Sequence, residues 1–86
     1  MLRLPTEISL DIAKRERVLR RKKRISQQTL SEKSGVSLGS IKRFETTGKI
    51  SLESLLQIAW ILERLPDFDS VFEYNQIPEH IDDIFR

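Results

Sequence analysis

The residues best suited to binding chemistry lie in the segment SLGSIKRFE (37–45). Helix positions i, i+1, i+4 and i+5 share one side, and in this segment they are Leu38, Gly39, Lys42 and Arg43. The planar guanidinium of Arg43 can donate two hydrogen bonds to O6 and N7 of guanine, and the ammonium of Lys42 can do so less directionally. This pattern predicts contacts with base edges in the major groove of DNA.

Gly39 in the same segment has two interpretations. Glycine inside a helix costs about 1 kcal/mol relative to alanine. Either the missing side chain lets the backbone approach the floor of the groove while Leu38 meets a thymine methyl, or the glycine is simply tolerated in a helix held by tertiary packing.

Residues that could support catalysis or metal binding are few. The chain has one histidine, His80, and no cysteine, and no cluster with metal-ligand spacing is found. Glu79, Asp82 and Asp83 are predicted to form a solvated face rather than a catalytic pair. We therefore expect neither an enzyme nor a bound metal or other cofactor.

Charge is distributed unevenly along the 86 residues. Residues 1–50 hold 13 Lys and Arg against five Asp and Glu, whereas residues 51–86 hold two against eight. A basic half favours an anionic partner such as nucleic acid, although a solvated basic surface is the alternative. No membrane-spanning run or signal peptide is recognised, and a cytoplasmic location is expected.

Helix signals recur along the whole chain and predict an all-α protein of about five helices. The first amphipathic stretch, EISLDIAKRERVLRRKKR (7–24), follows Pro5, and Thr6 or Ser9 is expected to be its N-cap. Ser26, Ser37 and Ser51 are N-cap candidates for three more helices. Gly35 is expected to end the first of these in left-handed conformation, and the second is expected to end at Gly48.

The chain after Ser51 is predicted to contain one long helix and shorter pieces. LESLLQIAWILERL (52–65) is expected to run until Pro66, with Leu52, Leu55, Ala59 and Leu62 on its core side. Asp67 is expected to cap a short helix FDSVF (68–72), and PEHIDDIF (78–85) to be a last helical piece. Residues 6–66 are predicted to form the main domain and residues 67–86 a short, acidic, helical segment.

Two of these helices, Gln27–Ser34 and Leu38–Thr46, are separated by Gly35-Val36-Ser37 alone. Short helices joined by a turn of this length with glycine form a helix-turn-helix. Apolar residues at regular positions are expected to pack the pair together: Leu30, Val36, Ile41 and Phe44.

The stretch ISQQTLSEKSGVSLGSIKRFETTGKISLESLLQIA (25–59) resembles the Xre/Cro-type helix-turn-helix of the lambda repressor-like family. The resemblance covers roughly residues 10–65. It implies that Leu38, Gly39, Lys42 and Arg43 read base edges. It implies that the DNA backbone is touched by Gln27, Ser40, Thr46 and Lys49, and Ser37 offers a helix N-terminus to a phosphate.

The resemblance also implies that Gln27 braces the second helix and that Arg20 and Glu45 form a partly buried ion pair. Three residues depart from the family pattern, of which Ser31, where alanine is common, is a mild change. Glu16 replaces an apolar residue and is expected to pair with Arg20 four positions on. Arg24 replaces a common glycine.

The segment LLQIAWIL (55–62) is apolar on all sides, which indicates burial on more than one side. Trp60 and Ile61 are therefore predicted to lie in a homodimer interface. The alternative is that the C-terminal segment folds back and covers this surface.

Together these features predict a DNA-binding transcriptional regulator, a repressor that binds an inverted repeat as a homodimer through Leu38–Thr46. A similarity to HipB-like antitoxins adds a HipA-like kinase toxin as a candidate partner. The alternative class is a protein-interaction module that uses the helix-turn-helix fold without specific DNA readout.

Overall fold

The computed structural model describes residues 3–74, which form four α-helices followed by one 3-10 helix. Their bounds are α1 Pro5–Lys22, α2 Gln27–Ser34, α3 Leu38–Thr47, α4 Leu52–Ile61 and η1 Leu65–Phe68. The all-α prediction is confirmed for this part of the chain, which contains no strand. None of its helices combines the length and the apolar composition needed to cross a bilayer.

Helices α2, α3 and α4 begin at the predicted serine caps, and α2 and α3 end at the predicted glycines. The hydroxyl oxygens of Ser26, Ser37 and Ser51 each accept a hydrogen bond from the backbone N–H three residues on, at 3.0, 3.1 and 3.1 Å. Gly35 and Gly48 follow α2 and α3 with φ of 77° and 78°, the left-handed region that glycine enters at little cost. The boundaries of α2 and α3 are thus determined by local residues.

The start of α1 differs from the prediction. The helix begins at Pro5, and Leu4 is its N-cap. The Glu7 carboxylate accepts a hydrogen bond of 3.0 Å from the Leu4 N–H, so Thr6 and Ser9 lie inside the helix. Proline suits the first helical position because its missing N–H would have had no partner there.

The chain after α4 also differs. Instead of continuing toward Pro66, α4 ends at Ile61, where Glu63 adopts a left-handed φ of 61° and the Arg64 N–H donates to the Ala59 carbonyl at 2.8 Å. The short helix expected over residues 68–72 is replaced by η1, which contains Pro66. The helix predicted over 78–85 lies outside the described residues.

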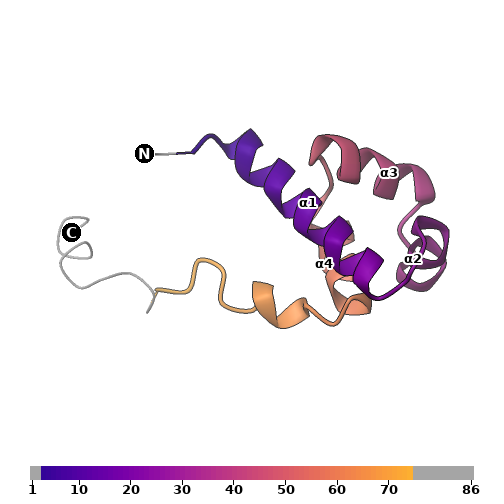
Figure 1. The fold of residues 1–86 in the computed structure, drawn as a ribbon. Helices are drawn as coiled ribbons and strands as arrows, with labels where there is room; N and C mark the ends of the chain where they lie inside the picture. The colour runs from indigo at the N-terminus through magenta and orange to yellow at the C-terminus, as the bar shows by residue number, and fades with distance from the viewer. Residues whose placement is uncertain (1–2, 75–86) are drawn as a thin grey trace.

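The helices surround one small core. Helix α1 packs against α3, α2 packs against both α3 and α4, and η1 packs against α4 (Figure 1). The core cluster contains Leu30, Val36, Ile41, Ile58 and Leu62. Leu52, expected in the core, is 67% exposed, and Ile58 is buried in its place.

Gly48 allows α1 and the end of α3 to approach closely. A Cβ atom built on Gly48 would lie 2.8 Å from the Ser9 carbonyl carbon and 2.9 Å from the Leu10 nitrogen. Backbone atoms inside a helix cannot move aside to relieve such a clash, whereas the end of a flexible side chain can. Glycine at this position therefore sets how near α1 can come to α3.

Candidate nucleic-acid interface

The outer side of α3 carries the four residues predicted to read bases. Gly39, Lys42 and Arg43 are exposed, and Leu38 is partly buried. Among residues 3–74, the side chains of Lys42 and Arg43 form no hydrogen bond or ion pair. Their charged groups are therefore free to bind an external partner, and base reading by these residues stays a prediction.

The inner side of α3 is held by buried contacts. Ile41 and Phe44 are almost completely buried, and Glu45 is buried beside them. Because these positions are spaced three or four residues apart, they lie on the side opposite the exposed cations. The helix is thus fixed in rotation, and Lys42 and Arg43 must face outward.

A polar network joins α3 to α1 and α2. Arg20 Nε donates to Glu45 Oε2 at 2.8 Å, and Arg20 Nη2 donates to Glu45 Oε1 at 2.9 Å. Arg20 Nη1 also donates to the Ile25 carbonyl at 2.9 Å. The ion pair implied by the family resemblance is present in this two-point geometry, which is the strongest that arginine and carboxylate can form.

Gln27 completes this network from the first turn of α2. Its Nε2 donates to Glu45 Oε1 at 2.9 Å, so the side chain braces α3 as expected, while a phosphate contact by Gln27 stays a prediction. Burial by itself would raise the pKa of Glu45, but Arg20 and the other hydrogen-bonding neighbours lower it to about 2. Glu45 is therefore ionised at neutral pH.

Glu16 is a buried polar residue whose surroundings differ from those expected from the sequence. It lies 4.0 Å from Arg20 Nε, but neither of its carboxyl oxygens makes a hydrogen bond of normal geometry. Burial raises the pKa of Glu16 to about 9, and a hydrogen bond with the Glu45 carboxylate and the negative charge of that carboxylate add to the effect. The expected pairing with Arg20 is thus present, at a distance of 4.0 Å, but the raised pKa keeps the buried Glu16 carboxyl neutral at physiological pH.

Three predicted DNA-contacting residues gather at a hollow beside α3. Ser40, Arg43 and Lys49 line a space of about 350 Å³ together with Ser51 and Ser54 at the start of α4. Sequence reasoning missed these two serines as site residues, although Ser51 was recognised as an N-cap and follows Lys49 closely. The hollow brings cationic groups to the N-terminus of a helix, where backbone N–H groups favour anions.

The remaining backbone-contact candidates are exposed but have internal hydrogen bonds. The Ser37 hydroxyl donates to the Ser40 hydroxyl oxygen at 2.8 Å, and the Thr46 hydroxyl donates to the Lys42 carbonyl at 2.8 Å. Ser37, Ser40 and Thr46 are all exposed residues. Their predicted contacts with DNA therefore require only an approaching donor or a rearranged hydroxyl.

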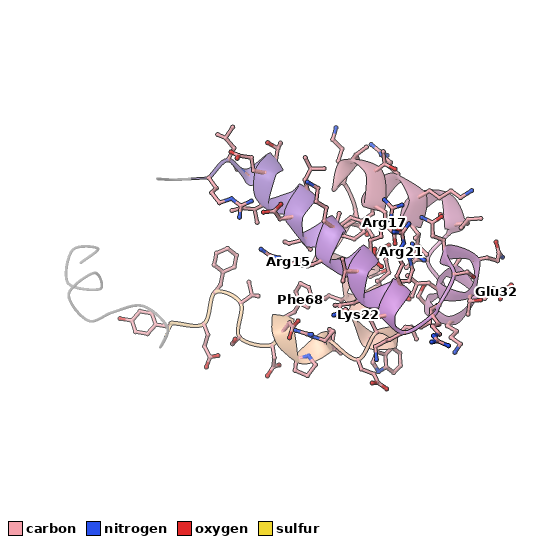
Figure 2. The ribbon with its side chains drawn as sticks, in the orientation of Figure 1. Arg15, Arg17, Arg21, Lys22, Glu32 and Phe68 are labelled. Carbon is pink, nitrogen blue, oxygen red and sulfur yellow. The ribbon has the colours of Figure 1, made fainter. Side chains whose placement is uncertain are left out.

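Further basic residues lie along α1. Figure 2 places Arg17 and Arg21 on the side of α1 toward α3 in this view, and Arg15 toward the segment that carries Phe68. Arg24, which replaces a glycine of the family pattern, has a left-handed φ of 58°. Arg24 thus adopts a backbone conformation that glycine adopts more easily.

Trp60 and Ile61, the predicted dimer residues, differ in exposure. Trp60 is 69% exposed, whereas Ile61 is partly buried against the core. They line a hollow with Ile25, Leu65 and Pro66. Segment 65–74 does not cover Trp60, and residues 75–86, to which the alternative of a folded-back C-terminus refers, lie outside the described residues.

Comparison with known proteins returns no match, whether to a protein-family model, a curated protein or a solved structure. Residues 3–74 contain no group of three or more His, Cys, Asp or Glu side chains that could hold a metal ion. His80, Glu79, Asp82 and Asp83 lie outside the described residues. Function must therefore be argued from the surface of α3 and its surroundings.

Proposed function

We propose that the protein is a sequence-specific DNA-binding regulator that places α3 in the major groove. Helices α2 and α3 and the turn between them would act as a helix-turn-helix of the Xre/Cro type, in a lambda repressor-like domain. One observation carries this proposal. The inner side of α3 is fixed by Ile41, Phe44 and Glu45, while Lys42 and Arg43 on its outer side have no partner in residues 3–74.

The hollow beside α3 supports binding of the DNA backbone. Phosphate oxygens are bound by lysine, by serine hydroxyls and by N–H groups at helix N-termini. Lys49, Ser40 and the N-terminus of α4 bring these groups together. In this arrangement the hollow fixes the position of the protein on the duplex, and the neighbouring Arg43 reads the bases.

The proposed regulator acts as a homodimeric repressor in the cytoplasm. Two copies related by a two-fold axis would bind half-sites about one helical turn apart in an inverted repeat. The exposed Trp60 supplies an aromatic group of the kind enriched in interface cores, and Ile61 lies next to it.

A more specific form of the proposal is an antitoxin that represses its own operon and binds a HipA-like kinase toxin. The acidic second half of the chain offers such a partner a surface of opposite charge to the DNA-binding half. A neighbouring kinase gene whose product purifies together with this protein would support this form. An isolated gene would count against it and leave DNA binding untouched.

DNA binding is tested by fluorescence anisotropy with the DNA upstream of the gene and with a random duplex of equal length. We expect Arg43→Ala to weaken binding to the upstream DNA by about 1–3 kcal/mol and to weaken binding to the random duplex much less. The matched control is Arg15→Ala, which removes the same charge from α1. Absence of a preference for the upstream DNA at low salt would overturn the proposal.

The competing class, a protein-interaction module, predicts a different outcome of the same titrations. Arg43→Ala would then cause an equal, small loss on both duplexes, because only net charge is involved. Lys49→Ala provides a second comparison. If Lys49 contacts a phosphate, binding to all duplexes weakens alike and the salt dependence falls by about one unit.

A further inference from the structure

Three cations form a stripe along the outer side of α1. Lys14, Arg17 and Arg21, called the α1 stripe below, are three and four residues apart and therefore lie on one side of the helix. All three are exposed, and none forms a hydrogen bond or an ion pair with residues 3–74. Like charges at this spacing destabilise a helix, so the stripe favours an anionic partner that relieves their repulsion.

The α1 stripe borders the predicted DNA-reading helix. Helix α1 meets α3 at two places: Arg20 is bound to Glu45 by two hydrogen bonds, and the backbone at Ser9 lies so near Gly48 that an added Cβ would be 2.8 Å away. The first two residues of the stripe lie between these two places along α1. Figure 2 shows both arginines of the stripe on the side of α1 toward α3 in this view.

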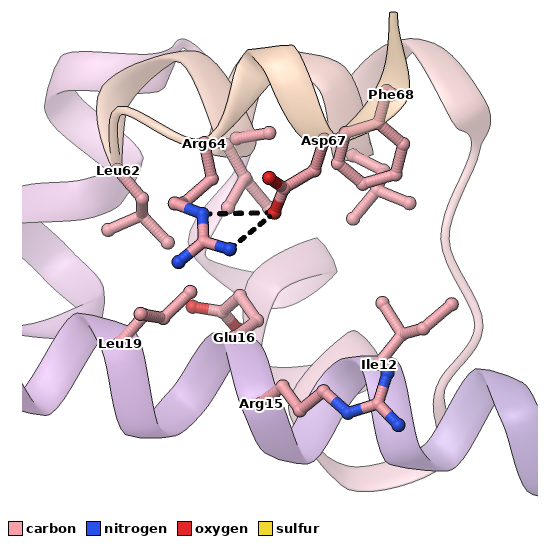
Figure 3. A pocket seen from close by; sticks show the side chains of 11 residues that line it. Ile12, Arg15, Glu16, Leu19, Leu62, Arg64, Asp67 and Phe68 are labelled. Carbon is pink, nitrogen blue, oxygen red and sulfur yellow. Dashed lines mark hydrogen bonds and ion pairs between the residues drawn. The ribbon is translucent and has the colours of Figure 1, made fainter. Parts of the chain in front are cut away.

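The other side of α1 borders a cavity that holds acidic as well as basic groups. Arg15 is two residues from Arg17, which places it about 200° away around the helix, and it lines the cavity between α1, α4 and η1 (Figure 3). In the same cavity wall, Arg64 is bound to Asp67 at 2.9 Å. Between residues 10 and 21, the side with the stripe holds no acidic residue. Positive charge on α1 is therefore concentrated toward α3.

The stripe extends the basic surface of α3 by a length that suits a DNA strand. Lys42, Arg43 and Lys49 are exposed cations on α3 and directly after it. From Lys14 to Arg21 the stripe is about 10 Å long, at a rise of about 1.5 Å per residue. Phosphates in one strand of duplex DNA follow one another about every 3.4 Å along the helix axis. The stripe therefore matches about three successive phosphates.

We propose that the α1 stripe binds the phosphate backbone of the DNA that flanks the groove occupied by α3. Lys14, Arg17 and Arg21 donate hydrogen bonds to phosphate oxygens, which position a protein on the duplex without reading its sequence. The stripe thus adds contacts outside the bases read by Arg43 and lengthens the duplex that each copy covers. This inference rests on the proposed DNA binding but does not require a sequence preference.

The salt dependence of binding to a random duplex tests the stripe. Because one phosphate contact is lost, Arg17→Gln is expected to reduce the slope of log K against log salt concentration by about 0.9 and to weaken binding about fivefold at low salt. The matched control is Arg15→Gln, which removes the same charge from the opposite side of the same helix and should keep the slope of the unaltered protein. Equal slopes for the two variants would overturn the proposal.

The same titrations separate this proposal from that of sequence reading by α3. If Arg17→Gln lowers the slope but no duplex is preferred over a random one, sequence reading is contradicted and the stripe is supported. If Arg43→Ala loses the preference for the upstream DNA while Arg17→Gln behaves as Arg15→Gln does, the stripe alone is contradicted.

Hydroxyl-radical footprinting on an operator duplex shows where the stripe binds. The double variant Arg17→Gln, Arg21→Gln is expected to lose protection of the sugar-phosphate backbone outside the half-sites. Lys49→Ala should instead lose protection beside the groove occupied by α3, and it serves as the comparison with an equal type of contact. Unchanged protection outside the half-sites in the double variant would contradict the proposal.

Discussion

Two regions of the molecule, residues 26–48 and residues 60–74, leave different kinds of groups exposed. In the first, helix ends are capped, apolar side chains are largely buried, and the cationic groups of Lys33, Lys42 and Arg43 have no partner among residues 3–74. In the second, large apolar side chains are at the surface, including Trp60, Val71 and the fully exposed Phe72. The first region buries its apolar side chains without a partner, and its exposed cations favour an anionic partner. The exposed side chains of the second region favour an apolar partner.

This difference has a physical origin in the networks behind each region. The first region is held from behind by Arg20, Glu45 and Gln27, which form charge-assisted hydrogen bonds between three helices. The second is attached mainly through contacts between α4 and η1. Changes in the first network should therefore affect folding, while changes in the second region should affect association.

The largest effect is expected from Arg20→Met, which removes one partner of the buried ion pair. Glu45 would remain buried without its cation, and breaking such a pair costs about 3–5 kcal/mol. Urea denaturation measures the change in the free energy of unfolding. Lys22→Met, at the exposed end of the same helix, is the control. An equal effect of the two variants would show that the network does not hold the first region.

Gly48→Ala should have the next largest effect. Its φ of 78° and the 2.8 Å approach of Ser9 combine left-handed strain with a backbone clash, and together they should cost about 2–4 kcal/mol. Gly35→Ala has nearly the same φ of 77°, but its new methyl group would meet the tip of the Gln57 side chain at 3.5 Å. Thermal denaturation of both variants separates strain from clash, and an equal loss would exclude a close approach of α1.

The pH dependence of stability should reveal Glu16. Its pKa is raised from 4.5 to about 9, so the stability contributed by its protonated form is complete below the unfolded value and is lost as pH rises toward 9. The pKa of Glu45 is lowered from 4.5 to about 2, so its contribution is present above the unfolded value and is lost as pH falls toward 2. Their combined contribution is greatest near the shared unfolded value.

Glu16→Gln should remove the alkaline part of this profile. The variant is expected to be about 1–3 kcal/mol more stable than the unaltered protein near pH 8, because folding then no longer requires Glu16 to take up the proton that it releases in the unfolded state. The acidic part, which belongs to Glu45, should remain. Denaturation with urea at a series of pH values measures both. A flat profile of the unaltered protein on the alkaline side would contradict the assignment.

Gly39→Ala should stabilise the protein by about 1 kcal/mol, the ordinary helix preference for alanine. An added Cβ would have no atom within 4 Å, so packing does not oppose it. The two interpretations of Gly39 differ only in DNA affinity. Weaker binding to the upstream DNA by the more stable variant supports a close approach of the backbone, whereas unchanged binding supports a tolerated glycine.

The smallest change in folding stability is expected from Trp60→Asp. The side chain is 69% exposed, and substitutions at such surface positions usually change the free energy of unfolding by about 0.5 kcal/mol or less. Sedimentation velocity tests the proposed homodimer: the unaltered protein is expected to sediment as a dimer and Trp60→Asp as single chains. A dimeric variant would show that Trp60 is not at the interface, and a monomeric unaltered protein would contradict the proposed homodimer.

The parts of the fold that local residues control could be predicted from the sequence. Ser26, Ser37 and Ser51 cap their helices in the structure as their side-chain chemistry indicates, and Gly35 and Gly48 adopt positive φ. The end of α4 could not be predicted, because Glu63 adopts the left-handed conformation without a glycine. Glu63 adopts it where the chain turns from α4 into η1, which packs against α4.

The candidate site was predictable to a similar extent. Helical periodicity separated Lys42 and Arg43 from Ile41 and Phe44, and the structure places them on opposite sides of α3. The burial of Glu16 and the exposure of Leu52 were not predictable, because both depend on how α1 and α4 cross the other helices. Tertiary packing overrides the residue's usual preference in each case.

The central claim, that the outer side of α3 reads DNA sequence, is tested most directly by selecting bound duplexes from a random-sequence library. The unaltered protein is predicted to enrich an inverted repeat with half-sites about one helical turn apart. Arg43→Ala should lose preference at one position in each half-site while Arg15→Ala enriches the same repeat. A library that shows no enriched sequence with the unaltered protein would contradict the account.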